Sequence, residues 1–241
     1  NNSVVLSNQE AGYLTNDQGF RFELKQEAPI TFPEARQREL DTWEMIGPYG
    51  GDILSITPHP QTADTIYAGT TNSLYITTDR GENWSLVAAS TFEGIGDVGA
   101  ITFDPSNSNT LYVGTALGVY KSTDGGAAWT ALPHPNSSFK KVVAIVVNPY
   151  NSHVYCMIGG YSNQYDRFYY SENGGQTWIN GSTNLGNQFA CVSMAIHPLS
   201  GKLYAASQLG MMGAPNAVAS WDGSTWTHLS SPTASYPVND M

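Results

Sequence analysis

The turn Thr77-Thr-Asp79-Arg-Gly81-Glu-Asn-Trp84 returns in altered form three more times along the chain. Its copies end at Trp129, Trp178 and Trp226, so that successive tryptophans are 45, 49 and 48 residues apart. A sequence that repeats itself at roughly 40 to 50 residues is built from copies of one supersecondary unit. The fold is therefore expected to be an array of such units.

Each unit contains four segments with the composition of short strands. An apolar run closed by Pro comes first, followed by a segment centred on Tyr, a strand that enters the polar turn, and a strand that starts at Trp. In the first unit these segments are 53–60, 65–69, 74–77 and 84–87. Four short strands per repeat, separated by turn residues, predict an all-β fold, a β-propeller of four-stranded antiparallel blades.

The repeats predict an N-terminal arm over residues 1–40 and a propeller over residues 41–241. The arm is interpreted either as a strap over the propeller or as a segment that pairs with a neighbouring chain. About four blades are present, and their units cover roughly 48–87, 94–132, 141–181 and 190–229.

Two segments predict that the propeller is incomplete. Trp43 to Ile46 resembles a fourth strand without its first three, so it is expected to close the last blade and remove an exposed sheet edge. Residues 237–241 align with residues 191–194 and are expected to begin a further blade. A longer polypeptide is the interpretation that follows.

Charge and cysteine content exclude several classes of protein. There are 10 Lys and Arg against 20 Asp and Glu, a net charge of −10, which argues against nucleic acid as a partner. No apolar run approaches the roughly 18 residues that span a bilayer, so no membrane span is expected. Cys156 and Cys191 lack zinc-site spacing and are either two buried thiols or one disulfide.

The repeated turn resembles the Asp-box, or BNR, repeat, whose pattern is S/T-x-D-x-G-x-x-W. The copies at 77–84 and 122–129 match this pattern, the third has Asn173 at the Asp position, and the fourth, from Asp222 to Trp226, is one residue shorter. The resemblance is to the propellers of sortilin-type receptors, xyloglucan-cleaving glycoside hydrolases and secreted bacterial surface proteins, and it covers residues 43–241.

The motif residues are expected to hold the fold rather than a ligand. A carboxylate at a turn accepts backbone N–H bonds, Gly supplies a positive φ, and Trp packs between blades. Contacts with an ion or a ligand are the alternative for the acidic positions. The residues assigned to this structural role are Asp79, Gly81, Trp84, Asp124, Gly126, Trp129, Asn173, Gly175, Trp178, Asp222 and Trp226.

The sequence argues against catalysis, although a hydrolase remains the alternative. A sialidase would need a cluster of arginines, and the chain has only five, scattered from Arg21 to Arg167. The run from Gly50 to Pro60 resembles the first blade of the xyloglucan hydrolases, but Thr71 stands where that resemblance implies a catalytic acid. Glycoside hydrolysis uses two carboxylates, so those of a hydrolase would be displaced or lie outside this sequence.

Binding is the remaining class of function, and loops opposite the Asp-box turns are its expected place. Tyrosines there could stack on sugars or anchor a protein, while charged residues orient the ligand. Asp97 and Asp166 lie in such loops without an evident partner. The candidate ligand-binding residues are Phe92, Glu93, Asp97, Tyr161, Tyr165, Asp166, Arg167, Met211 and Met212.

These observations predict a secreted or cell-surface propeller of bacterial origin that serves as a non-catalytic binding or structural module. Its expected partner is a protein or a glycan, and the resemblance implies a C-terminal sorting domain in such exported proteins. No cofactor or metal is expected, with calcium held by loop carboxylates as the alternative. Contact with a neighbouring chain is expected to involve residues 1–40.

Overall fold

A computed structural model describes residues 13–15, 21–23, 46–48, 51–92, 96–135, 141–159, 167–185, 189–208 and 217–229. The chain divides into two units, residues 1–45 and residues 46–241. In the first unit, β1 (Tyr13–Thr15) and β2 (Arg21–Glu23) pair as an antiparallel ribbon. Residues 43–45 of the expected closing strand and residues 237–241 of the expected further blade lie outside the described residues.

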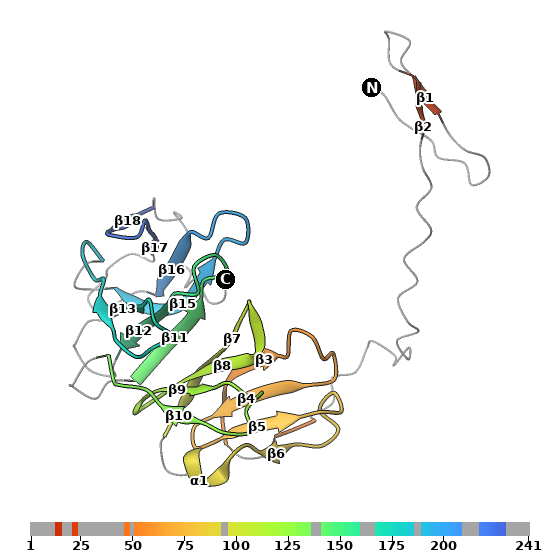
Figure 1. The fold of residues 1–241 in the computed structure, drawn as a ribbon, viewed down its shortest axis with the longest axis vertical. Coiled ribbons are helices and arrows are strands. Elements are labelled where there is room, and N and C mark those ends of the chain that lie inside the picture. The colour runs from red at the N-terminus through yellow and green to blue at the C-terminus, as the bar shows by residue number, and fades with distance from the viewer. Residues whose placement is uncertain are drawn as a thin grey trace. The chain divides into compact units, whose positions relative to one another are not determined.

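The described residues of the second unit form four antiparallel sheets of four strands each (Figure 1), which we call blades 1 to 4. Blade 1 contains β3 (Ile53–Pro58), β4 (Ile66–Thr70), β5 (Leu74–Thr77) and β6 (Ser85–Leu86). Blade 2 contains β7 (Val98–Asp104), β8 (Asn107–Thr115), β9 (Gly118–Ser122) and β10 (Thr130–Ala131). The expected all-β class is confirmed.

The other two blades have the same order of strands. Blade 3 contains β11 (Lys141–Val147), β12 (Val154–Gly159), β13 (Arg167–Ser171) and β14 (Ile179–Asn180). Blade 4 contains β15 (Ala190–Ile196), β16 (Leu203–Gln208), β17 (Ala217–Trp221) and β18 (Trp226–His228). A single described helix, α1 (Ala89–Phe92), follows blade 1.

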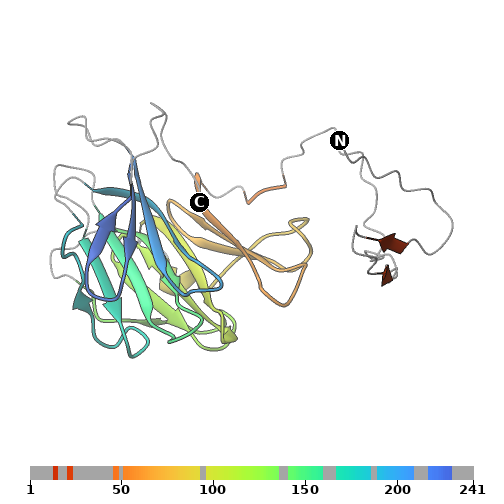
Figure 2. The same cartoon turned by 90° about the horizontal axis from the view of Figure 1, so that it is seen from above.

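The first strand of each blade lies beside the first strand of the next blade. Thus β3 contacts β7, β7 contacts β11, and β11 contacts β15. Figure 2 shows the sheets fanning out from these strands. Each first strand also has a register shift near its start, so that one bulge residue follows Ile53, Val98, Val142 and Cys191. A bulge increases local twist, and its repetition bends every first strand in the same way.

The hydrophobic core lies between the blades rather than inside any one of them. Between blades 1 and 2, Tyr67 and Leu74 pack against Val98 and Ile101. The approach is close, because a Cβ atom on Gly69 would collide with the backbone and side chain of Val98. Comparable clusters fill the next two junctions. The stability of each blade therefore depends on its neighbours.

The two cysteines occupy this core. Cys156 lies on β12 and Cys191 on β15, both are buried, and no disulfide joins them. Burial raises the pKa of the Cys156 thiol far above its ordinary value, because a thiolate would lose its hydration there. Of the two alternatives from the sequence, buried thiols are the one observed.

Candidate functional site

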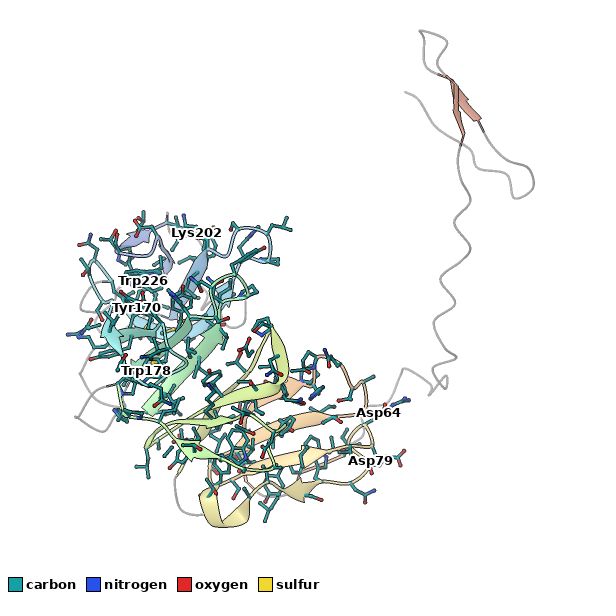
Figure 3. The ribbon with its side chains drawn as sticks, in the orientation of Figure 1. Asp64, Asp79, Tyr170, Trp178, Lys202 and Trp226 are labelled. Atoms are coloured by element: carbon teal, nitrogen blue, oxygen red, sulfur yellow. The ribbon has the colours of Figure 1, made fainter. Side chains whose placement is uncertain are left out.

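The antiparallel order of the strands gives every blade two distinct ends. The links between strands one and two and between strands three and four lie at one end, which we call the turn face. The links between strands two and three, and the starts of the first strands, lie at the other end, which we call the loop face. Figure 3 shows Asp64 and Asp79, from the two turn-face links of blade 1, at the same end of that blade.

On the turn face, the Asp79 carboxylate is bonded within its own turn. One oxygen accepts from the Thr77 hydroxyl at 2.7 Å and the Asn83 backbone N–H at 2.9 Å, and the other accepts from the Asn83 side-chain amide at 2.7 Å. These bonds, led by the Asn83 side chain, lower the Asp79 pKa to about 2. The Thr77 hydroxyl in turn accepts from the N–H of Gly81, whose φ is 96°.

The next two turns repeat this arrangement. Asp124 accepts from the Ala128 backbone N–H and the Ser122 hydroxyl, and these bonds lower its pKa in that order of strength. Asn173 uses its amide oxygen in the same way, accepting at 2.9 Å from both the Ser171 hydroxyl and the Thr177 backbone N–H. The bonds therefore need an oxygen acceptor, and Asn supplies one without a charge.

The shortened fourth turn is held by a different set of bonds. Asp222 accepts from the backbone N–H groups of Ser224 and Thr225, both at 2.8 Å, and from the hydroxyls of the same two residues. The two backbone bonds are the main cause of its lowered pKa. In this turn, which has one residue fewer between Asp and Trp, the backbone donors lie two and three residues after the acid instead of four. The carboxylate still accepts the hydrogen bonds that hold the turn.

The tryptophans that close these turns connect neighbouring parts of the fold. The Trp178 indole N–H donates to the Pro133 carbonyl at 2.9 Å, and that of Trp226 donates to the Gly181 carbonyl at 3.1 Å. Each acceptor belongs to the end of the preceding blade. Trp84 donates to the Ile46 carbonyl at 2.9 Å in the corresponding way. Trp129 instead donates to Gly126 in its own turn.

The polar side chains described above on the turn face are therefore engaged in holding turns. His59 and His197 follow the same rule, since each accepts backbone N–H bonds at Nδ1 within its own strand-one-to-two link. Among the described residues, no group of three His, Cys, Asp or Glu side chains is placed to hold a metal ion.

On the loop face, two equivalent turns are built around a buried threonine. The Thr70 hydroxyl accepts from the backbone N–H of Asn72 and Ser73, and Thr115 forms the corresponding bond with Leu117. These turns are tied to the start of the first strand, because the N–H of Thr71 donates to the Asp52 carbonyl at 3.2 Å. Thr71, where the resemblance implied an acid, is thus a residue of a tight turn.

Asp97 forms an ion pair across two blades. Its carboxylate lies 2.8 Å from Lys141 Nζ, and the two side chains are 21% and 20% exposed. Asp97 directly precedes β7 and Lys141 begins β11, so neighbouring first strands bring them together. The Lys141 side chain passes close to Gly99, because a Cβ atom added there would lie only 3.2 Å from Lys141 Cε.

Asp97 was expected to have no evident partner, and Lys141 was not among the candidate residues. A usable signal was present, because each residue stands immediately before the first buried residue of its strand, one repeat apart. Equivalent positions in adjacent blades are neighbours around the propeller. The exposed Asp52 holds the same position in blade 1.

Phe92 is a correction to the expected binding residues. Its side chain is fully buried, and its ring lies 5.1 Å from Trp129 and 5.5 Å from Tyr120 between ring centres. It therefore belongs to the core between blades 1 and 2 and presents no surface to a ligand. Phe92 is the final residue of α1, and its side chain belongs to the cluster between blades 1 and 2.

Arg167 begins β13 at the loop face and is partly exposed, so it remains a candidate. Its fellow candidates Glu93, Tyr161, Tyr165, Asp166, Met211 and Met212 lie outside the described residues. The segment 160–166 nevertheless joins β12 to β13 and therefore leaves and re-enters blade 3 at the loop face.

Comparison with solved structures decides the fold. The GH74 enzyme of Niastella koreensis matches with a TM-score of 0.60 and 23% identity, over 73% of this chain and 30% of that chain. YCF48 bound to D1 peptide matches with a TM-score of 0.57 and 18% identity, over 79% of this chain and 56% of that chain. The fold is that of a β-propeller. A chain of the COPII coat assembled on membranes matches with a TM-score of 0.53 and 13% identity, over 72% of this chain and 26% of that chain.

These similarities establish the architecture, because propellers at such low identity host unrelated functions. The chain spans between a quarter and somewhat over half of the length of the structures that it matches. No model of a known protein family matches the sequence, and no curated protein matches it. In the described part of the chain, no helix has the length and apolar character needed to cross a membrane.

Proposed function

We propose that this chain is a non-catalytic propeller module of the Asp-box kind, which binds a protein or a glycan at its loop face. We further propose that it is exported by a bacterium and acts outside the cell or at its surface. The net charge of −10 and the small number of lysines fit that setting.

The observation that carries the proposal is that four of the described carboxylates are held in hydrogen bonds or an ion pair. A glycosidase ordinarily uses one carboxyl group as the acid and a second as the nucleophile or base. Asp79, Asp124 and Asp222 are bonded within their turns, and Asp97 faces Lys141. Asp52 is exposed on the loop face, but Thr71 beside it is not an acid. The geometry therefore favours recognition over hydrolysis.

The similar structures support both kinds of partner. YCF48 is a propeller solved with a D1 peptide, and the GH74 relatives include a xyloglucanase from Xanthomonas campestris, which matches with a TM-score of 0.56. The alternative function is therefore a glycoside hydrolase that acts on a polysaccharide through carboxylates outside the described residues.

Affinity electrophoresis in gels containing xyloglucan, with a parallel assay for new reducing ends, tests the glycan arm. We expect retardation without release of reducing ends, and loss of retardation in a Tyr161→Ala/Tyr165→Ala variant. Tyr150→Ala is the matched control, because that tyrosine is 61% exposed on the turn face. Release of reducing ends would establish the hydrolase instead, and unchanged migration would reject this glycan as the ligand.

A further inference from the structure

Two asparagines of blade 3 are each followed by glycine, in the pairs Asn173-Gly174 and Asn180-Gly181. Such a pair is chemically labile, because the glycine nitrogen can attack the side-chain amide of the asparagine and no Cβ atom obstructs the approach. Both asparagines are exposed, whereas Gly174 is partly exposed and Gly181 is buried. The two pairs therefore show how the fold affects one reaction within a single chain.

The attacking nitrogen is held by a hydrogen bond at the second pair but not at the first. The Gly181 N–H donates to the Phe168 carbonyl at 3.0 Å, and this bond must break before the nitrogen can react. The Gly174 N–H has no acceptor among the described residues, although the N–H of the next residue, Gly175, donates to Ser171. The Gly174 nitrogen is therefore the more available nucleophile.

The other Asp-box turns show that this N–H is an exception. In blade 1, the Arg80 N–H donates to the Asp64 carbonyl at 3.0 Å. In blade 2, the Gly125 N–H donates to the Asn109 carbonyl at 2.9 Å. Ser152 holds the corresponding position of blade 3 by strand register, but its φ of 55° lies in the left-handed region. The link of blade 3 thus follows a different path and does not hold the turn at this point.

The carbon under attack is polarised by the same turn. The Asn173 Oδ1 accepts from the Ser171 hydroxyl and from the Thr177 backbone N–H, each at 2.9 Å. Two donors aimed at one carbonyl oxygen stabilise the negative charge that develops there when a nucleophile adds. Among the described residues, the Asn180 Oδ1 accepts from the Ser182 N–H alone, at 2.9 Å. The third Asp-box turn is therefore better arranged for the attack.

A cation also lies beside the attacking peptide. A Cβ atom on Gly174 would lie 2.9 Å from Lys121 Nζ. The nearest group to a Cβ atom on Gly125, the equivalent residue of blade 2, is the neutral Asn109 side chain at 4.0 Å. The nitrogen must lose its proton to react, and a nearby positive charge favours the deprotonated form.

We propose that Asn173 deamidates in the folded protein and that the turn around it promotes the reaction. The Gly174 nitrogen gives its proton to hydroxide and forms a bond to Asn173 Cγ. Ammonia then leaves with a proton taken from water, which regenerates the hydroxide and closes a five-membered succinimide. Water opens this ring at Cγ to give aspartate, or at the backbone carbonyl to give isoaspartate. Water is the only reagent consumed.

The aspartate product fits the turn in which it forms. An acid at position 173 completes the S/T-x-D-x-G-x-x-W pattern and can accept the same two bonds at Oδ1. The Thr177 hydroxyl, which now accepts from the Asn173 amide at 2.8 Å, can donate to the new oxygen, as the Asn83 side chain donates to Asp79 in blade 1. The aspartate form therefore gains a negative charge and keeps its bonds, whereas isoaspartate lengthens the backbone of the turn.

Ageing of the full chain in mildly alkaline buffer tests the proposal. Chymotrypsin cleaves after Trp178 and separates the two pairs, so mass spectrometry can follow the conversion of each amide to an acid. In the folded chain, Asn173 should convert on the order of tenfold faster than Asn180. In urea that unfolds the chain, the two rates should become similar, because both sites are then plain Asn-Gly pairs. A folded chain in which Asn173 converts no faster than Asn180 overturns the proposal.

Substitutions of Ser171 separate promotion by the turn from simple exposure of Asn173. Ser171→Ala removes one donor to Oδ1 and should slow the conversion, whereas Ser171→Thr keeps the hydroxyl, as Thr77 does in blade 1, and should retain the rate. A turn that was merely loosened would react faster instead. A Ser171→Ala chain that keeps its near-ultraviolet circular dichroism and converts as fast as the unchanged chain, or faster, therefore contradicts the proposal.

An Asn173→Asp variant identifies the product. The aspartate form of the aged chain should elute with this variant in anion exchange, and the variant should show no further conversion at position 173. An aged chain whose new acidic form carries its acid at another position contradicts the assignment. Asn173 lies on the turn face, so these outcomes are independent of the binding function proposed for the loop face.

Discussion

Ile145 and Ile56 hold the same position in the first strands of blades 3 and 1, but only Ile145 is buried. The difference does not come from the residues, because both are isoleucine and both pair with their own second strand. It comes from the neighbouring blade, which covers Ile145 and leaves Ile56 open. In this repeat fold, the sequence of each unit determines its own strands. Packing against the neighbouring unit determines how much each side chain contributes to the stability of the protein.

The largest expected effect comes from truncating those two isoleucines. Ile145→Ala should lower the free energy of unfolding by about 3 kcal/mol, because it leaves a cavity in a packed junction. Ile56→Ala should cost less than about 1 kcal/mol, since little of that side chain is removed from water. Urea unfolding at low protein concentration measures both values. Equal losses of unfolding free energy would mean that Ile56 is covered in solution, and the two positions would then not differ.

The second-strand tyrosines sharpen the same contrast with a hydrogen bond. The buried Tyr67 hydroxyl donates to the Gly125 carbonyl of blade 2 at 2.7 Å, whereas Tyr204 has no following blade among the described residues. Tyr67→Phe should cost about 1 kcal/mol, because it leaves that carbonyl without its donor. Tyr204→Phe should change the unfolding free energy by less than about 0.5 kcal/mol. The two variants can be compared by thermal unfolding.

Tyr67 also has an expected pH signature. Burial, followed by the charge of Asp124, raises the Tyr67 pKa above its ordinary value of 10.0, so the folded protein keeps the phenol proton longer than the unfolded chain does. Stability should therefore fall as the pH rises above about 10. Tyr67→Phe should reduce that slope, and a Tyr67→Phe variant that loses stability with pH as steeply as the unchanged chain would contradict the assignment.

The sequence could predict the strands and the turns because they are local and repeated. Thr77, Asp79, Gly81 and Trp84 lie within eight residues, and the bonds among them follow from turn chemistry alone. The resemblance of residues 43–46 to a fourth strand also fits the position of Ile46 against Gly81. In these cases the relevant neighbour is close in sequence or is specified by the repeat.

The sequence could not predict which side chains meet across blades. Lys141, the partner of Asp97, lies 44 residues further along the chain. The equivalent position holds Asp in blades 1 and 2, so the repeat does not predict a lysine there. Phe92 was expected at a ligand-binding surface because it lies in a loop opposite the repeated turns, yet it is the last residue of the helical turn α1 and its side chain is buried in the core. Both errors concern contacts that exist only after two blades have packed.

The Lys141–Asp97 pair tests whether burial between blades strengthens an ion pair. The pair of Arg80 and Asp64 serves as the comparison, since its side chains are 74% and 50% exposed within blade 1. A double-mutant cycle with Lys141→Met and Asp97→Asn should give a coupling energy of about 1 kcal/mol. The corresponding cycle for Arg80 and Asp64 should give a smaller value that vanishes in 1 M salt. A larger coupling for the exposed pair would refute the role given to the junction.

The smallest effect distinguishes the charged turns from the neutral one. Hydrogen bonds from Asn83 and Thr77 lower the Asp79 pKa from 3.8 to about 2, so the ionised carboxylate stabilises the folded state above its unfolded pKa. That contribution is lost as the pH falls from about 4 towards 2. Asn173 accepts the equivalent bonds without titrating, so Asp79→Asn should leave the melting temperature near neutrality almost unchanged and flatten its fall in acid. An Asp79→Asn variant that melts as steeply in acid as the unchanged chain would show that the turn does not depend on the charge of Asp79.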